Sequence, residues 1–295
     1  AFAQKEPPLL WAVRNEDYIS TSIWCKTLPY VLTNGAGGAV NAWDATNLNH
    51  VGTTNAFANN GYPSVSEPLG VVAMITHVFG NRRVSTVSLA TGNILDNLAV
   101  PSLSALNTAA ISPDGNKIAV AGAWGGNFKV EIYDRVSHSL LGSNWFASNI
   151  SEVRFSNDSS RLLCAIGTHL TFLHGATANL QGSTPSSYYN LTWSPDDQYV
   201  IGADSAGGVR VISSSTFANV LTLPGTTWGK FLPSGDKIVA ASNTGELKTH
   251  AFPSGSQLSS VFTGGATYRG DTSPDGTKVV INDDKGTSLW SLPTQ

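Results

Sequence analysis

The fold of this chain is decided by the stretch Ser112-Pro113-Asp114-Gly115-Asn116-Lys117-Ile118-Ala119-Val120-Ala121-Gly122, which is followed by Val130-Glu131-Ile132-Tyr133-Asp134. Proline fixes φ and glycine accepts a left-handed backbone, so the first four residues predict a tight polar turn. The two largely apolar runs that follow, one ending in small residues and the other at an aspartate, indicate β-strands. Together these features predict an antiparallel β-meander.

Degraded copies of the same turn recur along the chain, and an apolar run of similar length follows each copy. The anchors of the seven copies lie near residues 27, 67, 112, 156, 194, 232 and 273. The mean step is (273 − 27)/6, or 41 residues, so seven units account for nearly all 295 residues. A period near 40 is typical of propellers and other repeat proteins.

These units predict an all-β chain, a seven-bladed β-propeller of four-stranded antiparallel blades that forms a single domain over residues 1–295. The last unit offers only three strands, whereas the apolar run over residues 9–14 precedes the first unit and has no partner there. We therefore expect residues 9–14 to pair as the outer strand of the last blade. This pairing would close the ring and remove its free ends.

The spacing and several short motifs resemble those of the WD-repeat propellers and of the related YVTN-type and TolB-like propellers. These motifs are Ser-Pro-Asp-Gly at Ser112 and Ser273, Asn41-Ala42-Trp43-Asp44 in the first unit, and Ile132-Tyr133-Asp134 in the third. The resemblance covers about the whole chain and implies the fold rather than a subfamily. The Gly-His pair that usually opens a WD repeat is missing from every unit, and only one unit ends in Trp-Asp.

The composition predicts a surface that is polar but weakly charged. Asn, Ser and Thr together number 83, against 37 charged residues, and the net charge is −3. Phosphate binding needs clustered Lys and Arg, so we expect no nucleic-acid partner. No apolar run approaches the roughly 20 residues of a membrane span, so we expect no span. Cys25 and Cys164 fall in units that are not ring neighbours, so we expect no disulfide.

The sequence contains no familiar motif for catalysis or for cofactor binding. It has no Gly-X-Ser-X-Gly, no His-Glu-X-X-His and no phosphate-binding Gly-Lys-Ser/Thr loop, and its six histidines are scattered. We therefore expect no enzymatic activity, no cofactor and no metal. Asn282-Asp283-Asp284 and Asp204 hold equivalent places in two units, so Ca²⁺ near Asp283 and Asp284 is an alternative. A solvated turn is the simpler interpretation.

Large side chains gather on one face of the predicted ring, where the connections between blades and the turns between second and third strands lie. Aromatic residues and Arg dominate interface energetics, so this set predicts a binding rim. Trp124 is the most informative member, because glycines flank it in a turn. The alternative is that most of these rings pack between neighbouring blades. The candidates are Trp124, Trp145, Phe146, Tyr188, Tyr189, Trp228, Tyr268, Arg269, Arg82 and Arg83, with Phe57 and Tyr62 in the long insertion Thr53 to Pro68.

We interpret the chain as a non-enzymatic propeller whose partners are other protein subunits of an assembly. Its Asn-, Ser-, Thr- and Gly-rich surface resembles that of phage and other virion structural proteins, which implies a capsid decoration or tail protein located in the virion. A cellular WD-repeat-like or TolB-like scaffold, cytoplasmic or secreted without disulfides, is one alternative. A glycan-binding lectin or a glycan-acting enzyme that uses the rim aromatics is another, and hydrolysis would need a carboxylate pair.

Overall fold

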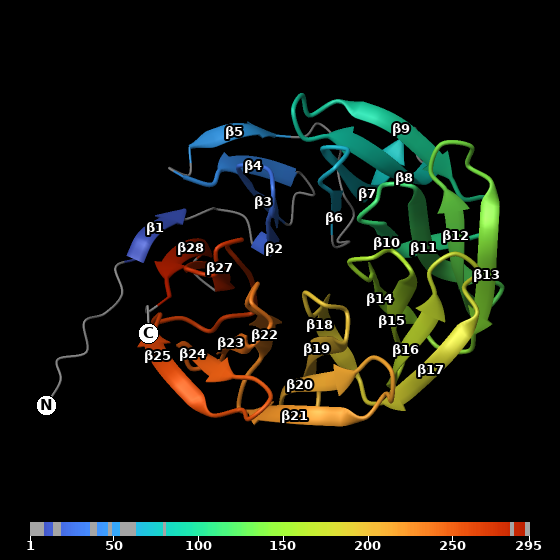
Figure 1. Cartoon of the computed structure of the whole chain (residues 1–295). Helices are drawn as coiled ribbons and strands as arrows, with labels where there is room; N and C mark the ends of the chain where they lie inside the picture. Colours follow the sequence, from blue (N-terminus) through green and yellow to red (C-terminus); the bar gives the residue numbers. More distant parts are fainter. Residues whose placement is uncertain are drawn as a thin grey trace, which may run out of the picture.

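The computed structural model describes residues 9–13, 19–35, 40–46, 49–53, 63–78, 81–283 and 286–292. These residues form seven four-stranded antiparallel sheets, which lie as blades around a central axis (Figure 1). The described residues contain strands and turns but no helix, and therefore no helix that could cross a membrane. The predicted seven-bladed β-propeller is confirmed.

The strands of each blade are called a to d from the axis outward. Blades 1 and 2 consist of β2 (Ile19–Trp24), β3 (Tyr30–Gly35), β4 (Val40–Asp44) and β5 (His50–Thr53), then β6 (Ser64–Ser66), β7 (Val71–Val78), β8 (Asn81–Ser88) and β9 (Ile94–Ala99). Blades 3 and 4 consist of β10 (Ala105–Ile111), β11 (Lys117–Trp124), β12 (Asn127–Asp134) and β13 (Leu140–Phe146), then β14 (Ile150–Phe155), β15 (Arg161–Ile166), β16 (His169–His174) and β17 (Leu180–Pro185).

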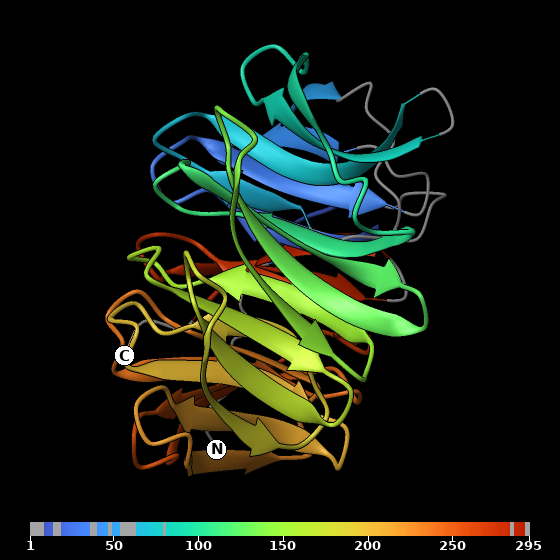
Figure 2. The ribbon, with the colours of Figure 1, turned by 90° about the vertical axis from the view of Figure 1, so that its right-hand side faces the viewer.

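Blades 5 to 7 follow the same order. Blade 5 consists of β18 (Tyr188–Trp193), β19 (Tyr199–Asp204), β20 (Gly208–Ser213) and β21 (Asn219–Pro224). Blade 6 consists of β22 (Trp228–Phe231), β23 (Lys237–Ala241), β24 (Glu246–Ala251) and β25 (Gln257–Phe262). Blade 7 consists of β26 (Arg269–Thr272), β27 (Lys278–Asp283), β28 (Gly286–Ser291) and β1 (Leu9–Val13). Figure 2 views the ring from the side of β13, with the blades side by side around the circumference.

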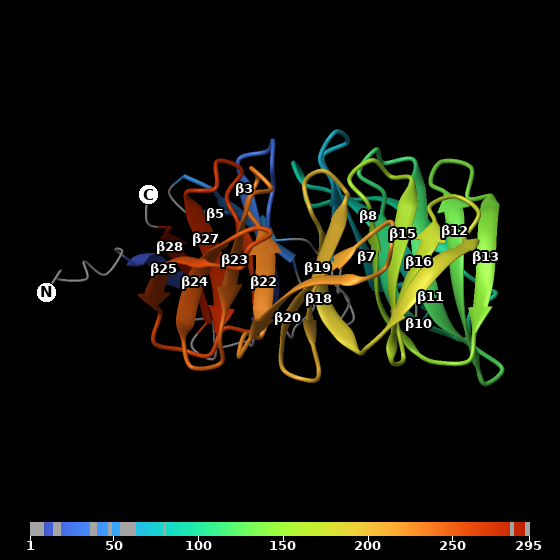
Figure 3. The same ribbon diagram turned by 60° about the horizontal axis from the view of Figure 1, so that its bottom comes forward.

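The ring closes through β1, which is the outer strand of blade 7. Leu9 pairs with Trp290 and Val13 with Thr287 in an antiparallel ladder with β28, and the two strands lie side by side in Figures 1 and 3. The predicted closure by residues 9–14 is confirmed, with the strand ending at Val13. Closure joins strands from the two ends of the sequence within one sheet.

The outer strand of every blade carries a β-bulge at its second residue. In blade 3, Leu140 pairs with Tyr133 and Gly142 with Ile132, so Leu141 has no cross-strand partner. The closing strand β1 repeats this irregularity, which shows that it occupies the same structural position as the other six outer strands. The bulged residues are Val51, Leu95, Leu141, Gln181, Val220, Leu258 and Leu10.

The a-to-b turns show why the Ser-Pro-Asp-Gly motif decides the fold. The Ser112 hydroxyl donates to Asp114 Oδ1 at 2.5 Å and accepts from the Lys117 N–H at 2.9 Å, and the Asp114 carboxylate also accepts from the Asn116 N–H. Gly115 has φ = 76°, the left-handed region that favours glycine. The turns that begin at Ser156, Ser194 and Ser273 repeat the serine and aspartate hydrogen bonds.

Neighbouring a-to-b turns are also tied to one another. The Asp197 carboxylate of blade 5 accepts from the backbone N–H groups of Asn157 and Asp158 in blade 4 at 2.9 Å. The Ser159 hydroxyl of blade 4 accepts from the Asp114 N–H of blade 3 at 3.2 Å. We call the side of the ring that carries these turns the turn face. The opposite side, with the b-to-c turns and the connections between blades, is the connection face.

The hydrophobic core is divided among the interfaces between blades. Each pair of neighbouring blades shares one cluster of buried apolar side chains, for example Ile118 and Val84 between blades 2 and 3. Trp24 and Leu289 belong to the cluster that seals blade 1 against blade 7. Cys25 and Cys164 are buried in two different clusters and are unpaired. Packing between consecutive sheets therefore holds the inner strands around an axial channel.

The predicted insertion from Thr53 to Pro68 is shorter in the structure. Ser64–Ser66 forms β6, the inner strand of blade 2. The Ser64 hydroxyl donates to the Ile111 carbonyl at 3.2 Å and the Ser66 hydroxyl to the Pro113 carbonyl at 3.0 Å, which ties this short strand to blade 3. Residues 54–62, and with them the candidates Phe57 and Tyr62, lie outside the described residues.

Candidate functional site

The most exposed of the predicted rim residues lie on blade 3. Trp124 ends β11 and pairs with Asn127, and Trp145 in β13 pairs with Lys129. Because paired residues and alternate residues of a sheet share a side, Trp124, Lys129 and Trp145 project from the same side of the blade. Trp124 is 48% exposed and Trp145 is 49% exposed. We call these three residues the blade 3 patch.

Lys129 of the blade 3 patch is held in place by Glu131 and by the Trp145 ring. Its Nζ lies 4.9 Å from the Trp145 ring centroid and 2.6 Å from Glu131 Oε1. Glu131 is buried, and its Oε2 also accepts from the Ser102 hydroxyl and, at 2.7 Å, from the Tyr133 hydroxyl. Burial works to raise the pKa of Glu131, but the hydrogen bonds from Lys129, Ser102 and Tyr133 together lower it. Burial raises the pKa of Tyr133 to about 12.

Other predicted residues flank the blade 3 patch without joining it. Phe146 is partly buried and packs with Phe128 against the core cluster between blades 3 and 4. Arg82 is exposed, and its guanidinium donates to the Leu106 carbonyl at 3.3 Å, which ties blade 2 to blade 3. Arg83 is half-buried on the same strand.

Two predicted tyrosines form a separate group near the axis. Tyr189 at the start of β18 is 40% exposed, and Tyr268 just before β26 is 44% exposed. The Asn190 side-chain amide donates to the Tyr268 carbonyl at 2.9 Å, so a contact joins blades 5 and 7 past blade 6. Asn190 has φ = 57°, a left-handed conformation that asparagine tolerates better than most residues.

Tyr188 and Trp228, two of the rim candidates, are buried, which matches the alternative that such rings pack between neighbouring blades. Tyr188 packs with Leu170 and Phe172 between blades 4 and 5, and Trp228 packs with Val239 between blades 6 and 7. Successive residues of a strand point to opposite sides, so the exposure of Tyr189 goes together with the burial of Tyr188. These two rings belong to the core.

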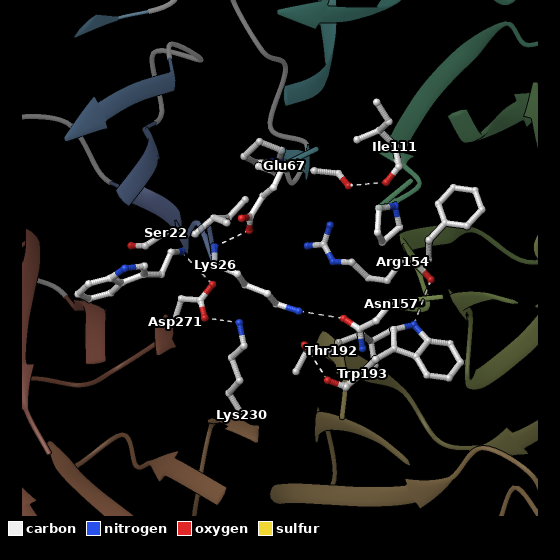
Figure 4. A pocket seen from close by; sticks show the side chains of 18 of the residues that line it. Ser22, Lys26, Glu67, Ile111, Arg154, Asn157, Thr192, Trp193, Lys230 and Asp271 are labelled. Atoms are coloured by element: carbon white, nitrogen blue, oxygen red, sulfur yellow. Dashed lines mark hydrogen bonds and ion pairs between the residues drawn. The ribbon is translucent and has the colours of Figure 1, made fainter. Parts of the chain in front are cut away.

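The axis holds a cavity of about 790 Å³, lined by the inner strands of all seven blades. It extends to the a-to-b turns of blades 1 to 4, so it reaches the turn face. Figure 4 shows Lys26, Arg154 and Lys230 directed toward its interior from three different blades. None of these three residues was predicted from the sequence, whereas the predicted Arg269 is half-buried and also lines the cavity. We call this cavity the channel.

The acidic side chains of the channel are hydrogen-bonded within the protein. The Glu67 carboxylate accepts from the backbone N–H groups of Lys26 and Thr27 and from the Thr27 hydroxyl. The Asp271 carboxylate accepts from the Trp24 N–H at 3.0 Å and forms an ion pair with Lys230. These two acids therefore join blade 1 to blades 2, 6 and 7 around the channel.

Glu152 is the exception among the channel acids. Its Oε1 lies 3.1 Å from Arg154 Nε and 3.3 Å from the Leu191 N of blade 5, but its buried Oε2 has no hydrogen-bond partner. Burial raises the pKa of Glu152, although Arg154, the backbone N–H groups of Leu191 and Asn190, and Arg269 oppose this effect. The side chain is 1% exposed, so it has little contact with the channel solvent.

A signal for the channel residues exists in the sequence. In blades 4 to 7 the residues two and four positions before each turn anchor line the channel, since alternate residues of an inner strand face the axis. These residues are Glu152, Arg154, Asn190, Thr192, Trp228, Lys230, Arg269 and Asp271. An alignment of the units by their turns would have brought these positions together.

The described residues contain no group of three or more His, Cys, Asp or Glu side chains that could hold a metal ion. Of the two aspartates considered for Ca²⁺, Asp283 ends β27, and Asp284 lies outside the described residues. The Asp204 carboxylate in blade 5 accepts a hydrogen bond from the Ser186 hydroxyl at 2.6 Å and forms an ion pair with Arg210 Nε at 2.7 Å. Its carboxylate therefore serves a contact within the blade.

Comparison with known proteins adds no family to these observations. No protein-family model matches the chain. No curated protein is similar enough to count as a relative. The resemblance to WD-repeat and YVTN-type propellers therefore stands at the level of the fold.

Proposed function

We propose that this chain is a non-enzymatic propeller that binds another protein subunit through the blade 3 patch. The observation that carries the proposal is the pair Trp124 and Trp145, each about half exposed on one side of a rigid sheet. Half-exposed tryptophans lose water on association and are enriched among the residues that dominate binding energy. Lys129, fixed between Glu131 and the Trp145 ring, requires little further ordering when a partner docks.

We further propose that the assembly is a virion, in which the chain is a capsid decoration or tail protein. The support is compositional, because only 13% of the residues are charged while Asn, Ser and Thr are abundant. Mass spectrometry of purified virions and of host fractions from the source tests this proposal. Stoichiometric copies in the particles would support it. Recovery with cellular proteins instead would replace the virion by a cellular scaffold and leave the blade 3 patch to be tested there.

The binding role of the blade 3 patch is tested by the double variant Trp124→Ala/Trp145→Ala. We expect at least about a tenfold loss of incorporation into the assembly, because two central anchors are removed. Phe262→Ala is the matched control, since Phe262 is 61% exposed on blade 6. Thermal unfolding should show that both variants are folded. Equal incorporation of the double variant and the wild type would contradict the proposal.

The same pair of rings favours one second candidate, a glycan partner, because aromatic faces stack on sugar rings. A glycan array with the wild type and the double variant separates the two candidates. Glycan binding that disappears in Trp124→Ala/Trp145→Ala, together with no protein partner in the assembly, would replace the protein-binding proposal.

A further inference from the structure

The channel and the blade 3 patch differ in the kind of hydrogen-bonding group that remains available to a ligand. Its carboxylates are supplied with donors from the protein: Glu67 has three and Asp271 has the Trp24 N–H and Lys230. Asp114 and Asp158 accept from the serines and N–H groups of their own turns. The carboxylates at the turn-face end of the channel are therefore poor candidates for binding a cationic ligand.

Lys26 differs from these carboxylates, because its charged group has few hydrogen-bond partners in the protein. Its Nζ donates to one neutral acceptor, the Asn157 side-chain oxygen on the far side of the channel, at 3.0 Å (Figure 4). No ion pair joins its ammonium to a carboxylate of the described residues. An ammonium has three N–H donors, so two of them remain for a ligand or for solvent in the channel.

The surroundings of Lys26 disfavour its positive charge. The side chain is exposed to solvent at the channel, and partial desolvation there lowers the pKa of Lys26. The charge of Lys230 lowers the pKa of Lys26 further, and the carboxylates of Asp271, Glu67 and Asp197 oppose this change only in part. An anion placed beside the ammonium would therefore stabilise its charged form.

We propose that the channel binds a small molecule through a single carboxylate, which contacts the Lys26 ammonium and displaces it from Asn157. The volume of about 790 Å³ falls within the range of small-molecule sites. Arg154, which pairs with Glu152, is directed into the same space and adds to its positive charge. Asn157 keeps its own partners, since its side-chain amide donates to Asp197 and to the Ser194 carbonyl, so it stays in place when Lys26 turns.

The charges of the channel select a ligand with one negative charge. Its lining contains four basic side chains, Lys26, Arg154, Lys230 and Arg269, and five acidic ones, Glu67, Asp114, Glu152, Asp158 and Asp271. Lys230 and Arg154 already pair with acids, whereas Lys26 is bound to a neutral oxygen, so one added charge is neutralised there. A second negative charge, as on phosphate, would lie among carboxylates that repel it.

The test uses benzoate as the probe and benzamide as its uncharged match in shape. We expect calorimetry to show saturable benzoate binding below about 10 mM and at least tenfold weaker binding of benzamide and of inorganic phosphate. Lys26→Met keeps the length of the side chain without its charge, and it should weaken benzoate binding at least about tenfold. Lys248→Met removes a lysine that pairs with Glu246 outside the channel and should leave binding unchanged.

A second measurement uses the wild type alone, so it does not depend on the folding of a variant. Lysine modification by trinitrobenzenesulfonate, followed by peptide mass spectrometry, should show that benzoate protects Lys26 and leaves Lys248 reactive. Absence of protection, equal benzoate binding by Lys26→Met, or tighter binding of phosphate than of benzoate would overturn the proposal. The channel and the blade 3 patch share no residue, so either proposal can fail without the other.

Discussion

Two glutamates on neighbouring blades, Glu131 in β12 and Glu152 in β14, are each 1% exposed and lie beside a basic side chain. Both oxygens of Glu131 accept hydrogen bonds, whereas Oε2 of Glu152 accepts none. The pKa of Glu131 is lowered and that of Glu152 is raised. Low solvent exposure alone therefore does not decide whether a carboxylate stays charged, because the balance between desolvation and the donors around it decides the sign of the pKa shift.

This difference separates the two candidate sites. At the blade 3 patch, a fully bonded Glu131 stays ionised and fixes Lys129 against Trp145, which orders a surface for a partner. In the channel, donors are distributed so that Glu67 and Asp271 are well supplied while Lys26 meets only an amide oxygen. The blade 3 patch is ordered before it binds, and in the channel the Lys26 ammonium keeps N–H donors for a ligand.

The largest expected effect comes from Glu131→Gln, which removes the charge that neutralises a lysine side chain only 12% exposed. Breaking a buried pair by removing one partner costs about 3 kcal/mol of unfolding free energy. Urea unfolding at pH 7 measures this value. Glu246→Gln is the control, because the Glu246–Lys248 pair is solvent-accessible and should contribute less than about 1 kcal/mol. Equal effects of the two substitutions would show that the donors of Glu131 do not stabilise the blade.

A smaller effect is expected from Tyr133→Phe, which removes one donor and leaves the Ser102 and Lys129 contacts of Glu131. A hydrogen bond to a charged group contributes about 1.5 kcal/mol or somewhat more. The variant should also make stability less sensitive to acid. Glu131 has a depressed pKa, so its contribution is present above its unfolded pKa and is lost as pH falls through the folded pKa. With one donor fewer, the folded pKa lies closer to the unfolded pKa, so less stability is lost on acidification. Unfolding curves of the variant and the wild type between pH 7 and pH 3 measure the acid sensitivity of each. Equal acid sensitivity of the two proteins would contradict the prediction.

The smallest effect, with the opposite sign, is expected from Glu152→Gln. A carboxyl with a raised folded pKa stabilises the fold fully below its unfolded pKa, and that contribution is lost as pH rises through the folded pKa. Glutamine does not ionise, so the variant should equal or exceed the wild type in stability at pH 7, by less than about 1 kcal/mol. The difference should shrink toward pH 4. A loss as large as that of Glu131→Gln would show that Glu152 is a supporting anion after all.

The fold could be predicted because its determinants are local. The Ser112 hydroxyl, the Asp114 carboxylate and the left-handed Gly115 form one turn within a few residues, and the same hydrogen bonds recur in the turns that begin at Ser156, Ser194 and Ser273. The exposure of Trp124 could be predicted for the same reason, since the two-residue turn Gly125-Gly126 follows it directly and has no side chains to cover it. Interactions between residues that lie close together in the sequence can be predicted from the sequence alone.

Which of the rim rings are buried could not be decided from the sequence, because the side of the sheet that a residue faces depends on the register of its strand. The strand of Tyr188, for example, has an irregularity between Tyr189 and Thr192. The channel was missed for a different reason. Lys26 and Asn157 are 131 positions apart, and only the closed ring brings them within 3.0 Å. Long-range pairs of this kind depend on how many blades the ring has and how they are tilted.

The bulged outer strands have a consequence for how these molecules meet one another. A propeller of seven blades presents seven sheet edges on its circumference, and an unbroken edge is a template on which a strand from another molecule can pair. Here each edge is interrupted at its second residue, β1 included, and five of the bulged residues, Leu141 among them, are exposed aliphatic side chains. Such an edge cannot extend a regular ladder past the interruption. We therefore expect that molecules crowded rim to rim touch through side chains. They should separate again instead of growing into a common fibre through strand pairing.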